Sequence, residues 1–382
     1  MSELNERLKI DNTFVPVEPD DQYLLQVNAL KKYFPVKGGF VSHTVGYVKA
    51  VDGITFNLRR GACMGLVGES GCGKSLTCRA ILAINDKKCS SSGKILYNSD
   101  EKGEIDLLSM DPRGKNIRAI RGKDIAMIFQ EPMVAFSPLY TIGNQITEAT
   151  LLHITKDKKK AKEITLDVMK KVGIANAEKR YNQYPHEFSG GMLQRAMISM
   201  ALVCNPKILI ADEPTTALDV TIQAQILELM KEMQKDFNMG ILFITHDLGV
   251  VAKMCDRVNV MYLGRIVESG TTEKIYEDPE HPYTRGLMGS VHKIGQKKTE
   301  RLFSIEGTVP LAMNLPRACG FYERCDARIE GLCDRAEPEL VEIAPEHSVA
   351  CFACQHPACQ AQRKAAEEMI RREDEQGGEK HG

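Results

Sequence analysis

The most restrictive feature of this 382-residue sequence is the segment GESGCGKS at residues 68–75, which fits the phosphate-binding P-loop pattern. The uncharged run CMGLV precedes it and predicts a buried strand, and LTCRAILAI follows it with the apolar spacing of a helix. Backbone N–H groups at such a helix start face the β-phosphate of a nucleotide, and glycines allow the close approach. We expect Lys74 to lie between the β- and γ-phosphates and the Ser75 hydroxyl to bind Mg²⁺. The predicted nucleotide-binding residues are Gly68, Glu69, Ser70, Gly71, Cys72 (through its backbone), Gly73, Lys74, Ser75 and Leu76.

An acidic pair, Asp212 and Glu213, ends the segment ILIADE, which begins with four apolar residues. The run predicts a buried strand whose end points Asp212 toward the metal. Glu213 is then placed to polarise an attacking water, which is general-base work in phosphoryl transfer. A strand that ends in Asp-Glu is as often structural when it stands alone. In a chain that also carries a P-loop, it indicates a catalytic site.

Two further polar residues follow predicted strands. Gln130 comes after IAMIF, and we expect it to reach the metal and the attacking water; His246 comes after GILFIT and is placed to contact the γ-phosphate. A lone Gln or His is more often structural. Their positions favour a functional role, because ligands of open α/β sheets bind just beyond strand ends.

A second anion site is predicted at Ser189-Gly190-Gly191, where a hydroxyl and backbone donors precede a helical run. One active centre needs only one phosphate cradle. Two cradles in one chain imply that the nucleotide lies between the P-loop of one subunit and this segment of another.

Strands alternate with helices, which predicts an α/β fold with a mainly parallel sheet. Residues 145–183 are polar and rich in helix formers. The run KDKKKAKE within them predicts a solvated helix face rather than a binding patch. The segment at 36–47 has three glycines and directly follows Pro35, and it is expected to form a lengthened edge loop without an assigned role.

Taken in order, these motifs resemble the ATP-binding subunit of an ABC transporter. The residues that carry the resemblance are the P-loop, Gln130, the segment FSGGM, the strand ILIADE, the D-loop Ala217-Leu218-Asp219 and His246. The resemblance implies a P-loop NTPase of ABC type, with a RecA-like core, an antiparallel β subdomain and a helical subdomain at about 131–203. The implied domains are a polar arm (1–22), an ATPase domain (23–275), a small cysteine-rich extension (276–360) and a charged tail (361–382).

The resemblance also implies cofactors and roles. ATP and Mg²⁺ would be bound across a sandwich dimer with a second ATPase subunit, a paralogue, whose ATP would touch Ser189, Gly190 and Gly191. Asp219 would lie at the dimer interface and couple the conformations of the two ATP sites. The implied catalytic set is Lys74, Gln130, Glu213 and His246, and the implied Mg²⁺ set is Ser75, Gln130 and Asp212.

Two details of this resemblance stay open or depart from the family pattern. Phe34 is the preferred residue for stacking on adenine, and Tyr33 and Tyr47 compete for that role. Met192 replaces the glutamine that commonly ends the signature segment, but the Ser-Gly-Gly donors remain.

The segments HPYTRGLM and IEGTVPLAMNLPRACGFYERC resemble the extension of oligopeptide/dipeptide importers, a branch that includes nickel importers. The likeness is strongest to the first of their two ATPase subunits. It implies two membrane permeases as partners, a substrate-binding protein as an indirect one, and a permease docking surface at EPMVAFSPLYTIGNQI. Import of nickel or another small solute is the alternative.

Half of the chain's twelve cysteines lie within a short stretch near its end. In a reducing compartment such crowding indicates a metal or cluster site before disulfides. The spacing of Cys319, Cys325, Cys333 and Cys351 resembles the four thiolates of a [4Fe–4S] cluster, with Zn²⁺ or no metal as alternatives. Cys354 and Cys359 exceed the family's four and could replace a ligand.

The net charge and the hydropathy pattern limit the classes of protein to which this chain can belong. With 50 Lys+Arg against 51 Asp+Glu there is no basic field for nucleic acid, which disfavours a soluble ABC protein acting on ribosomes or DNA. An exporter ATPase is disfavoured by the HPYT and cysteine extension. No run approaches the roughly 20 apolar residues of a membrane span, and the N-terminus lacks a secretory pattern. We therefore expect a peripheral protein at the cytoplasmic face of the membrane.

Overall fold

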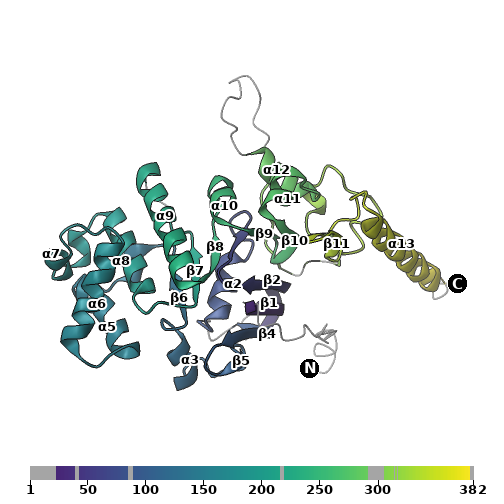
Figure 1. Cartoon of the computed structure of the whole chain (residues 1–382). Coiled ribbons are helices and arrows are strands. Elements are labelled where there is room, and N and C mark those ends of the chain that lie inside the picture. The colour runs from purple at the N-terminus through teal and green to yellow at the C-terminus, as the bar shows by residue number, and fades with distance from the viewer. Residues whose placement is uncertain are drawn as a thin grey trace.

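The structure is a computed structural model that describes residues 23–38, 43–84, 89–215, 219–290, 305–313, 315 and 317–378. Two sheets form its centre, a helical lobe lies at one end, and a C-terminal extension lies at the other (Figure 1). The predicted N-terminal arm, 1–22, lies outside the described residues.

The larger sheet has eight strands in the order β11-β12-β10-β9-β3-β8-β7-β6. Strands β9, β3, β8, β7 and β6 pair in parallel, whereas β10, β11 and β12 pair antiparallel. The parallel strands are short, uncharged or nearly so, and almost fully buried, as expected for a sheet that helices cover on both faces. Their bounds are β3 Cys63–Val67, β6 Ile125–Ile128, β7 Ile208–Asp212, β8 Gly240–Ile244, β9 Arg257–Tyr262, β10 Arg265–Thr271, β11 Val341–Ala344 and β12 His347–Val349.

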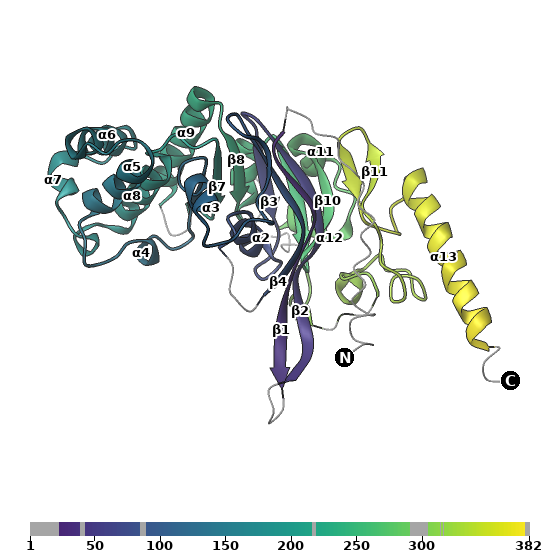
Figure 2. The same cartoon turned by 90° about the horizontal axis from the view of Figure 1, so that it is seen from below.

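The smaller sheet is antiparallel, in the order β2-β1-β4-β5. Its strands are β1 Tyr23–Gly38, β2 His43–Arg59, β4 Ser90–Ser99 and β5 Gly103–Asp106. The prediction of a loop over 36–47 is wrong for most of this segment. Residues 36–38 and 43–47 continue β1 and β2, because their backbones pair across the hairpin. Figure 2 shows this long hairpin projecting beyond the rest of the molecule.

Helices α2 Lys74–Ile81, α3 Lys115–Ile120, α9 Val220–Phe237 and α10 Leu248–Met254 pack around the sheets. The helical lobe holds α4 Pro132–Ala135, α5 Ile142–His153, α6 Lys158–Lys171, α7 Ala177–Tyr181, a 3₁₀ turn at Pro185–Glu187, and α8 Gly190–Leu202. Its apolar faces share one core with the sheet through residues such as Leu193, Met197 and Leu209. The charged run KDKKKAKE begins α6 and is mostly exposed. No helix within the described residues combines the length and apolar character that a membrane span needs.

The C-terminal extension continues the larger sheet rather than standing apart from it. After α11 Thr272–Glu277 and α12 Pro282–Gly289, the chain forms a short 3₁₀ helix (Tyr322–Arg324), adds β11 and β12 beside β10, and ends in α13 Pro357–Gly378. Helix α13 starts before the predicted boundary at 360 and projects from the body of the molecule (Figures 1 and 2). The extension is thereby tied to the ATPase core by backbone hydrogen bonds between β10 and β12.

Candidate functional site

The P-loop crosses from the end of β3 to the start of α2, as the sequence predicts. Gly68 has φ +145° and Gly73 has φ +104°, values that other residues rarely adopt. A Cβ atom at Gly68 would lie 2.2 Å from the Met261 carbonyl oxygen, and one at Gly73 would lie 2.3 Å from the Ala50 carbonyl oxygen. These two positions therefore require glycine, both for their backbone conformation and for the close approach of other backbone.

Lys74 is buried at the first position of α2. Its Nζ donates hydrogen bonds to the carbonyl oxygens of Gly68 at 2.7 Å and Glu69 at 3.0 Å. The Cys72 thiol is also buried and lies 3.6 Å from Lys74 Nζ, so this side chain packs against the lysine. The ammonium group thus lies inside the P-loop, where a point charge can pair with phosphate oxygens.

Ser75 and Asp212 meet although they lie 137 residues apart, with Oγ to Oδ1 at 3.0 Å. Asp212 is the last residue of β7, and β7 lies two strands from β3 in the sheet. Burial raises the pKa of Asp212, and the neighbouring Glu213 carboxylate adds to this, while the Ser75 hydrogen bond opposes it. A hydroxyl and a carboxylate oxygen are the ligand types that Mg²⁺ prefers, so this pair fits the predicted metal position.

Gln130, Glu213 and His246 converge from three separate loops. Gln130 Nε2 donates to Glu213 Oε2 at 3.0 Å, and His246 Nδ1 lies 3.3 Å from Glu213 Oε1. Glu213 has φ +49°, and its backbone N–H bonds to the Ile244 carbonyl. A left-handed backbone at a non-glycine residue costs free energy and is often kept at functional sites. The arrangement holds one carboxylate beside the Ser75–Asp212 pair, where it can accept a proton.

The Ser-Gly-Gly segment opens α8. Ser189 is the N-cap, and its Oγ accepts the backbone N–H of Met192 at 3.4 Å. Nothing lies within 4 Å of a Cβ placed on Gly190, so this helix start faces open space. Helix α8 belongs to the helical lobe, whereas α2 lies against the sheets (Figures 1 and 2). The two predicted phosphate sites are therefore distinct places on the chain.

Of the predicted D-loop, only Asp219 lies within the described residues, where it caps α9 by accepting the Ile222 N–H at 2.9 Å. Ala217 and Leu218 lie outside them. The three aromatic candidates for adenine stacking differ in their contacts. The Tyr33 hydroxyl bonds to Asp52, which also pairs with Arg265, whereas Phe34 is half-buried and has the Lys32 ammonium 5.8 Å from its ring centroid. Tyr47 pairs with Pro35 in the hairpin.

The four cysteines with the cluster-like spacing come together. Cys319, Cys325, Cys333 and Cys351 line one small cavity beside His281 and Phe352, whereas Cys354 and Cys359 do not line it. Burial raises the pKa of Cys319 to about 12, and the other three thiols add to that rise. No group of three or more His, Cys, Asp or Glu side chains in the described part of the chain is arranged to hold a metal ion.

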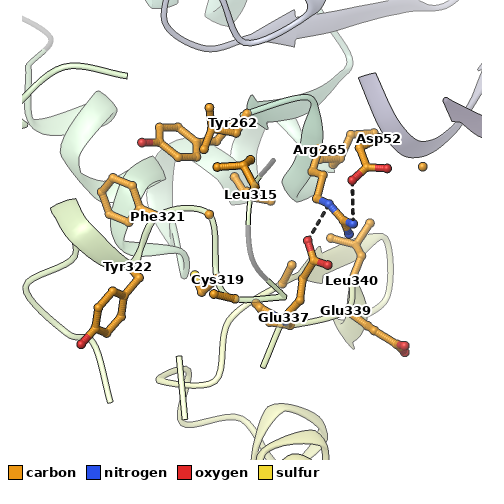
Figure 3. Close-up of a pocket in the computed structure, with 18 of the residues that line it drawn as sticks. Asp52, Tyr262, Arg265, Leu315, Cys319, Phe321, Tyr322, Glu337, Glu339 and Leu340 are labelled. Atoms are coloured by element: carbon orange, nitrogen blue, oxygen red, sulfur yellow. Dashed lines mark hydrogen bonds and ion pairs between the residues drawn. The ribbon is translucent and has the colours of Figure 1, made fainter. Parts of the chain in front are cut away.

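A separate cavity of about 730 Å³ lies between the sheets and the extension, and P-loop residues do not line it. Figure 3 shows Arg265 on its wall between the carboxylates of Asp52 and Glu337, with Nη2 at 3.0 Å and Nε at 2.6 Å. Tyr262 and Phe321 lie on the opposite side of the view.

Two contacts to the P-loop were not predicted from the sequence. Arg324 pairs with the Glu69 side chain, and the Tyr283 hydroxyl accepts the Glu69 backbone N–H. Tyr283 belongs to the HPYT segment, which the sequence marks as part of the extension but not as a contact of the P-loop. No sequence pattern marks Arg324, because nothing local relates it to a residue 255 positions away.

Comparison with known proteins agrees with this geometry. Residues 51–216 match the ABC transporter family, and residues 267–333 match the family described as "Oligopeptide/dipeptide transporter, C-terminal region". The dipeptide transport ATP-binding protein DppD of Bacillus subtilis is 46% identical over 327 residues, which are 85% of this chain and 95% of DppD. The chain belongs to the ATP-binding proteins of ABC transporters. It is therefore an ATPase of the ABC class.

Another relative supports this membership, and solved structures support the fold. The oligopeptide transport ATP-binding protein AppD of Bacillus subtilis is 45% identical over 86% of this ABC ATPase and 96% of AppD. Among solved structures, the dimeric bacterial ABC transporter cassette MJ0796 is 22% identical, with a TM-score of 0.56 over 65% of this chain and 98% of that one. The cbiO1 protein of Clostridium perfringens is 28% identical, with a TM-score of 0.52 over 68% of this chain and 92% of its own. The predicted ABC ATPase fold is thus confirmed.

Proposed function

We propose that this ABC ATPase hydrolyses ATP to power the import of dipeptides or oligopeptides. The observation that carries the proposal is that Gln130, Glu213 and His246 converge beside the Ser75–Asp212 pair. These groups come from the ends of four different strands, so they meet only in the folded chain. The peptide cargo is supported by the names of DppD and AppD and by the oligopeptide/dipeptide match over 267–333. Nickel or another small solute is the alternative cargo.

The residues of this chain divide the chemistry between them. Lys74 pairs with phosphate oxygens, and Ser75, Asp212 and Gln130 would hold Mg²⁺, which neutralises charge that develops on the phosphates. Glu213 orients the attacking water and accepts its proton. Gln130 and His246 hold the Glu213 carboxylate in place, and His246 would also contact the γ-phosphate. We propose Phe34 as the residue that stacks on adenine, because Asp52 already holds the Tyr33 hydroxyl.

We propose that the working form is a sandwich dimer with a second ABC ATPase, a paralogue. Each ATP would lie between one subunit's P-loop and the Ser189-Gly190-Gly191 helix start of the other. The open space at Gly190 supports this, because a phosphate group needs room and free N–H donors there. Asp219 would couple the conformation of one ATP site to that of the other across the dimer interface.

The docking surface for a permease is proposed on the segment after Gln130. Met133, Val134, Leu139 and Tyr140 are 60–78% exposed, an unusual cluster of large apolar side chains on a surface. Two membrane permeases covering this surface would keep the protein at the cytoplasmic face of the membrane. A substrate-binding protein would deliver cargo to the permeases without touching this chain.

A [4Fe–4S] cluster is proposed for Cys319, Cys325, Cys333 and Cys351. Two observations support the fit: all four thiols line one cavity, and each sulfur accepts a hydrogen bond from a nearby backbone N–H. Hydrogen bonds to the sulfurs are typical of cluster sites and stabilise the thiolate form. We propose a structural role, because the extension has only small apolar clusters of its own. Zn²⁺ in the same site is the alternative.

Peptide uptake tests the function. The chain is purified with its two permeases and second ATPase, inserted into liposomes, and supplied with the binding protein and labelled dipeptides. We expect uptake that requires internal ATP and stops in Lys74→Ala. Uptake of Ni²⁺ but not peptide would replace the cargo, and recovery of the chain with ribosomal RNA instead of permeases would reject the import function.

A further inference from the structure

The short loop between Cys319 and Cys325 reaches the P-loop through one side chain, Arg324. Its Nη1 lies 2.7 Å from Glu69 Oε2 and its Nη2 lies 3.1 Å from Oε1. Two parallel N–H···O bonds form the fork geometry that makes an arginine–carboxylate pair both strong and directional. The Arg324 side chain is 5% exposed and the Glu69 side chain is 32% exposed, so solvent screens this pair less than a fully exposed surface pair.

Arg324 also contacts two backbone carbonyl groups and two aromatic rings. Nε donates to the Glu306 carbonyl at 2.9 Å, and Nη2 also reaches the Gly307 carbonyl at 3.4 Å. The guanidinium lies 5.8 Å from the Tyr262 ring centroid and 5.9 Å from that of Phe321. Tyr262 comes from β9 of the ATPase core, and Phe321 comes from the cysteine loop. The position of Arg324 therefore depends on the order of the cysteine loop.

Glu69 lies at the phosphate end of this chain of contacts. It follows Gly68, its carbonyl oxygen accepts a hydrogen bond from Lys74 Nζ at 3.0 Å, and its N–H donates to the Tyr283 hydroxyl at 2.8 Å. A carboxylate in the P-loop would repel the phosphates of ATP unless its charge is compensated. Arg324 supplies that compensation.

We propose that Arg324 is a positioning residue for ATP binding: it neutralises Glu69 and fixes the P-loop, and it thereby makes the affinity for ATP depend on the Cys319–Cys325 loop. This inference rests on the proposed nucleotide site and not on any particular metal in the cysteine cavity. By linkage, ATP bound to the P-loop favours the ordered cysteine loop to the same extent.

The test measures binding of ATP with Mg²⁺ to the purified full chain by calorimetry. Arg324→Ala leaves Glu69 charged and unpaired, and we expect ATP to bind about 5- to 30-fold more weakly. Adding Glu69→Gln to Arg324→Ala removes the uncompensated charge and should restore most of the affinity. Arg324→Lys keeps the charge without the fork and should fall between Arg324→Ala and the unmodified chain.

The matched control is Arg335→Ala. Arg335 makes the same forked pair with Asp374 inside the extension, at 2.8 and 2.6 Å, without contact to the P-loop. It should leave ATP affinity unchanged. In the assembled transporter, Arg324→Ala should raise KM for ATP and leave kcat unchanged, which distinguishes a binding role from a general loss of active protein.

The outcomes separate this inference from the proposed function. If Lys74→Ala binds ATP as well as the unmodified chain, the nucleotide site itself is wrong. If Lys74→Ala loses binding while Arg324→Ala keeps it, the positioning role is wrong. If Arg324→Ala binds weakly and Glu69→Gln does not restore affinity, the contact is only structural, and the proposal is overturned. Should Arg324→Ala fail to fold, Arg324→Lys with and without Glu69→Gln gives the same comparison.

Discussion

Gln130 Nε2 donates a hydrogen bond to Glu213 Oε2 across 3.0 Å, although the two residues lie 83 positions apart. His246 contacts the other oxygen of the same carboxylate. Glu213 is thus oriented from two sides, and it directly follows the last residue of β7 with a left-handed backbone. A carboxylate held in this way can act on a water molecule without first searching for a conformation.

Replacing Glu213 with Gln should remove the proton acceptor and keep the shape of the side chain. We expect ATP turnover by the assembled transporter to fall about 10²- to 10⁴-fold, because that is the usual contribution of a general base. ATP affinity should not change, since Lys74 and the P-loop remain. Phosphate release and calorimetric ATP binding measure the two quantities. Glu232→Gln on the exposed face of α9 is the control, and full turnover by Glu213→Gln would contradict the assigned role.

Replacing Gly190 with Glu should separate dimer function from folding. Open space surrounds the position, and a negative charge in the first turn of α8 suits the helix dipole, so thermal stability should be unchanged or slightly higher. The single chain should still bind ATP at its own P-loop. ATP hydrolysis at the partner's P-loop should be lost, because the new carboxylate faces the phosphates bound there. Retained hydrolysis would show that the α8 start does not contact nucleotide, and Gly190→Ala serves as the size control.

Cysteine substitutions should divide into two classes. After anaerobic purification, Cys325→Ser should lose iron and sulfide together with the visible absorption of a cluster, because Cys325 lines the shared cavity. Cys359→Ser should keep them, since Cys359 hydrogen-bonds to Cys354 and does not line that cavity. Zinc in place of iron would select the alternative metal. Loss of metal from both variants would mean that the ligand set is different from the one proposed.

Acid should weaken the joint between the ATPase core and the extension. Glu268 on β10 is fully buried and accepts hydrogen bonds from His347 at 2.8 Å and from the N–H groups of Glu280 and His281. Burial alone would raise the pKa of Glu268, but these hydrogen bonds lower it below its usual 4.5. The unfolded chain therefore binds the proton more readily. The stabilisation is complete above pH 4.5 and is lost as the pH falls through the lower pKa of the folded chain.

Glu268→Gln tests this joint. At neutral pH the free energy of unfolding should fall by about 1–3 kcal/mol, because hydrogen bonds to a charged acceptor are weakened. Below pH 4.5 the stability of the variant should depend less on pH than that of the unmodified chain, as measured by denaturant unfolding. Glu330→Gln, at an exposed site in the extension, should change neither quantity. Equal pH dependence in Glu268→Gln and the unmodified chain would remove Glu268 from this account.

Much of the fold and most of the nucleotide site could be predicted because their signals are local. Short apolar runs such as ILIAD, bounded by turn residues, predict buried strands, and polar residues that directly follow such strands are expected at one edge of the parallel sheet. That rule alone brings Gln130, Asp212, Glu213 and His246 near the P-loop. The sequence predicts a loop over 36–47 because this segment has three glycines and follows Pro35, whereas backbone pairing with the opposite strand makes residues 36–38 and 43–47 parts of β1 and β2.

The amino-acid sequence by itself determined the P-loop, the strands that carry its partners and the helix start at Ser189, since each depends on neighbours within one turn or one strand. Only the tertiary structure decided that β12 joins β10 and that Arg324 pairs with Glu69. These contacts link loops that lack periodicity and lie far apart in the chain. Their partners are set by how the extension packs on the core, which no local pattern of residues records.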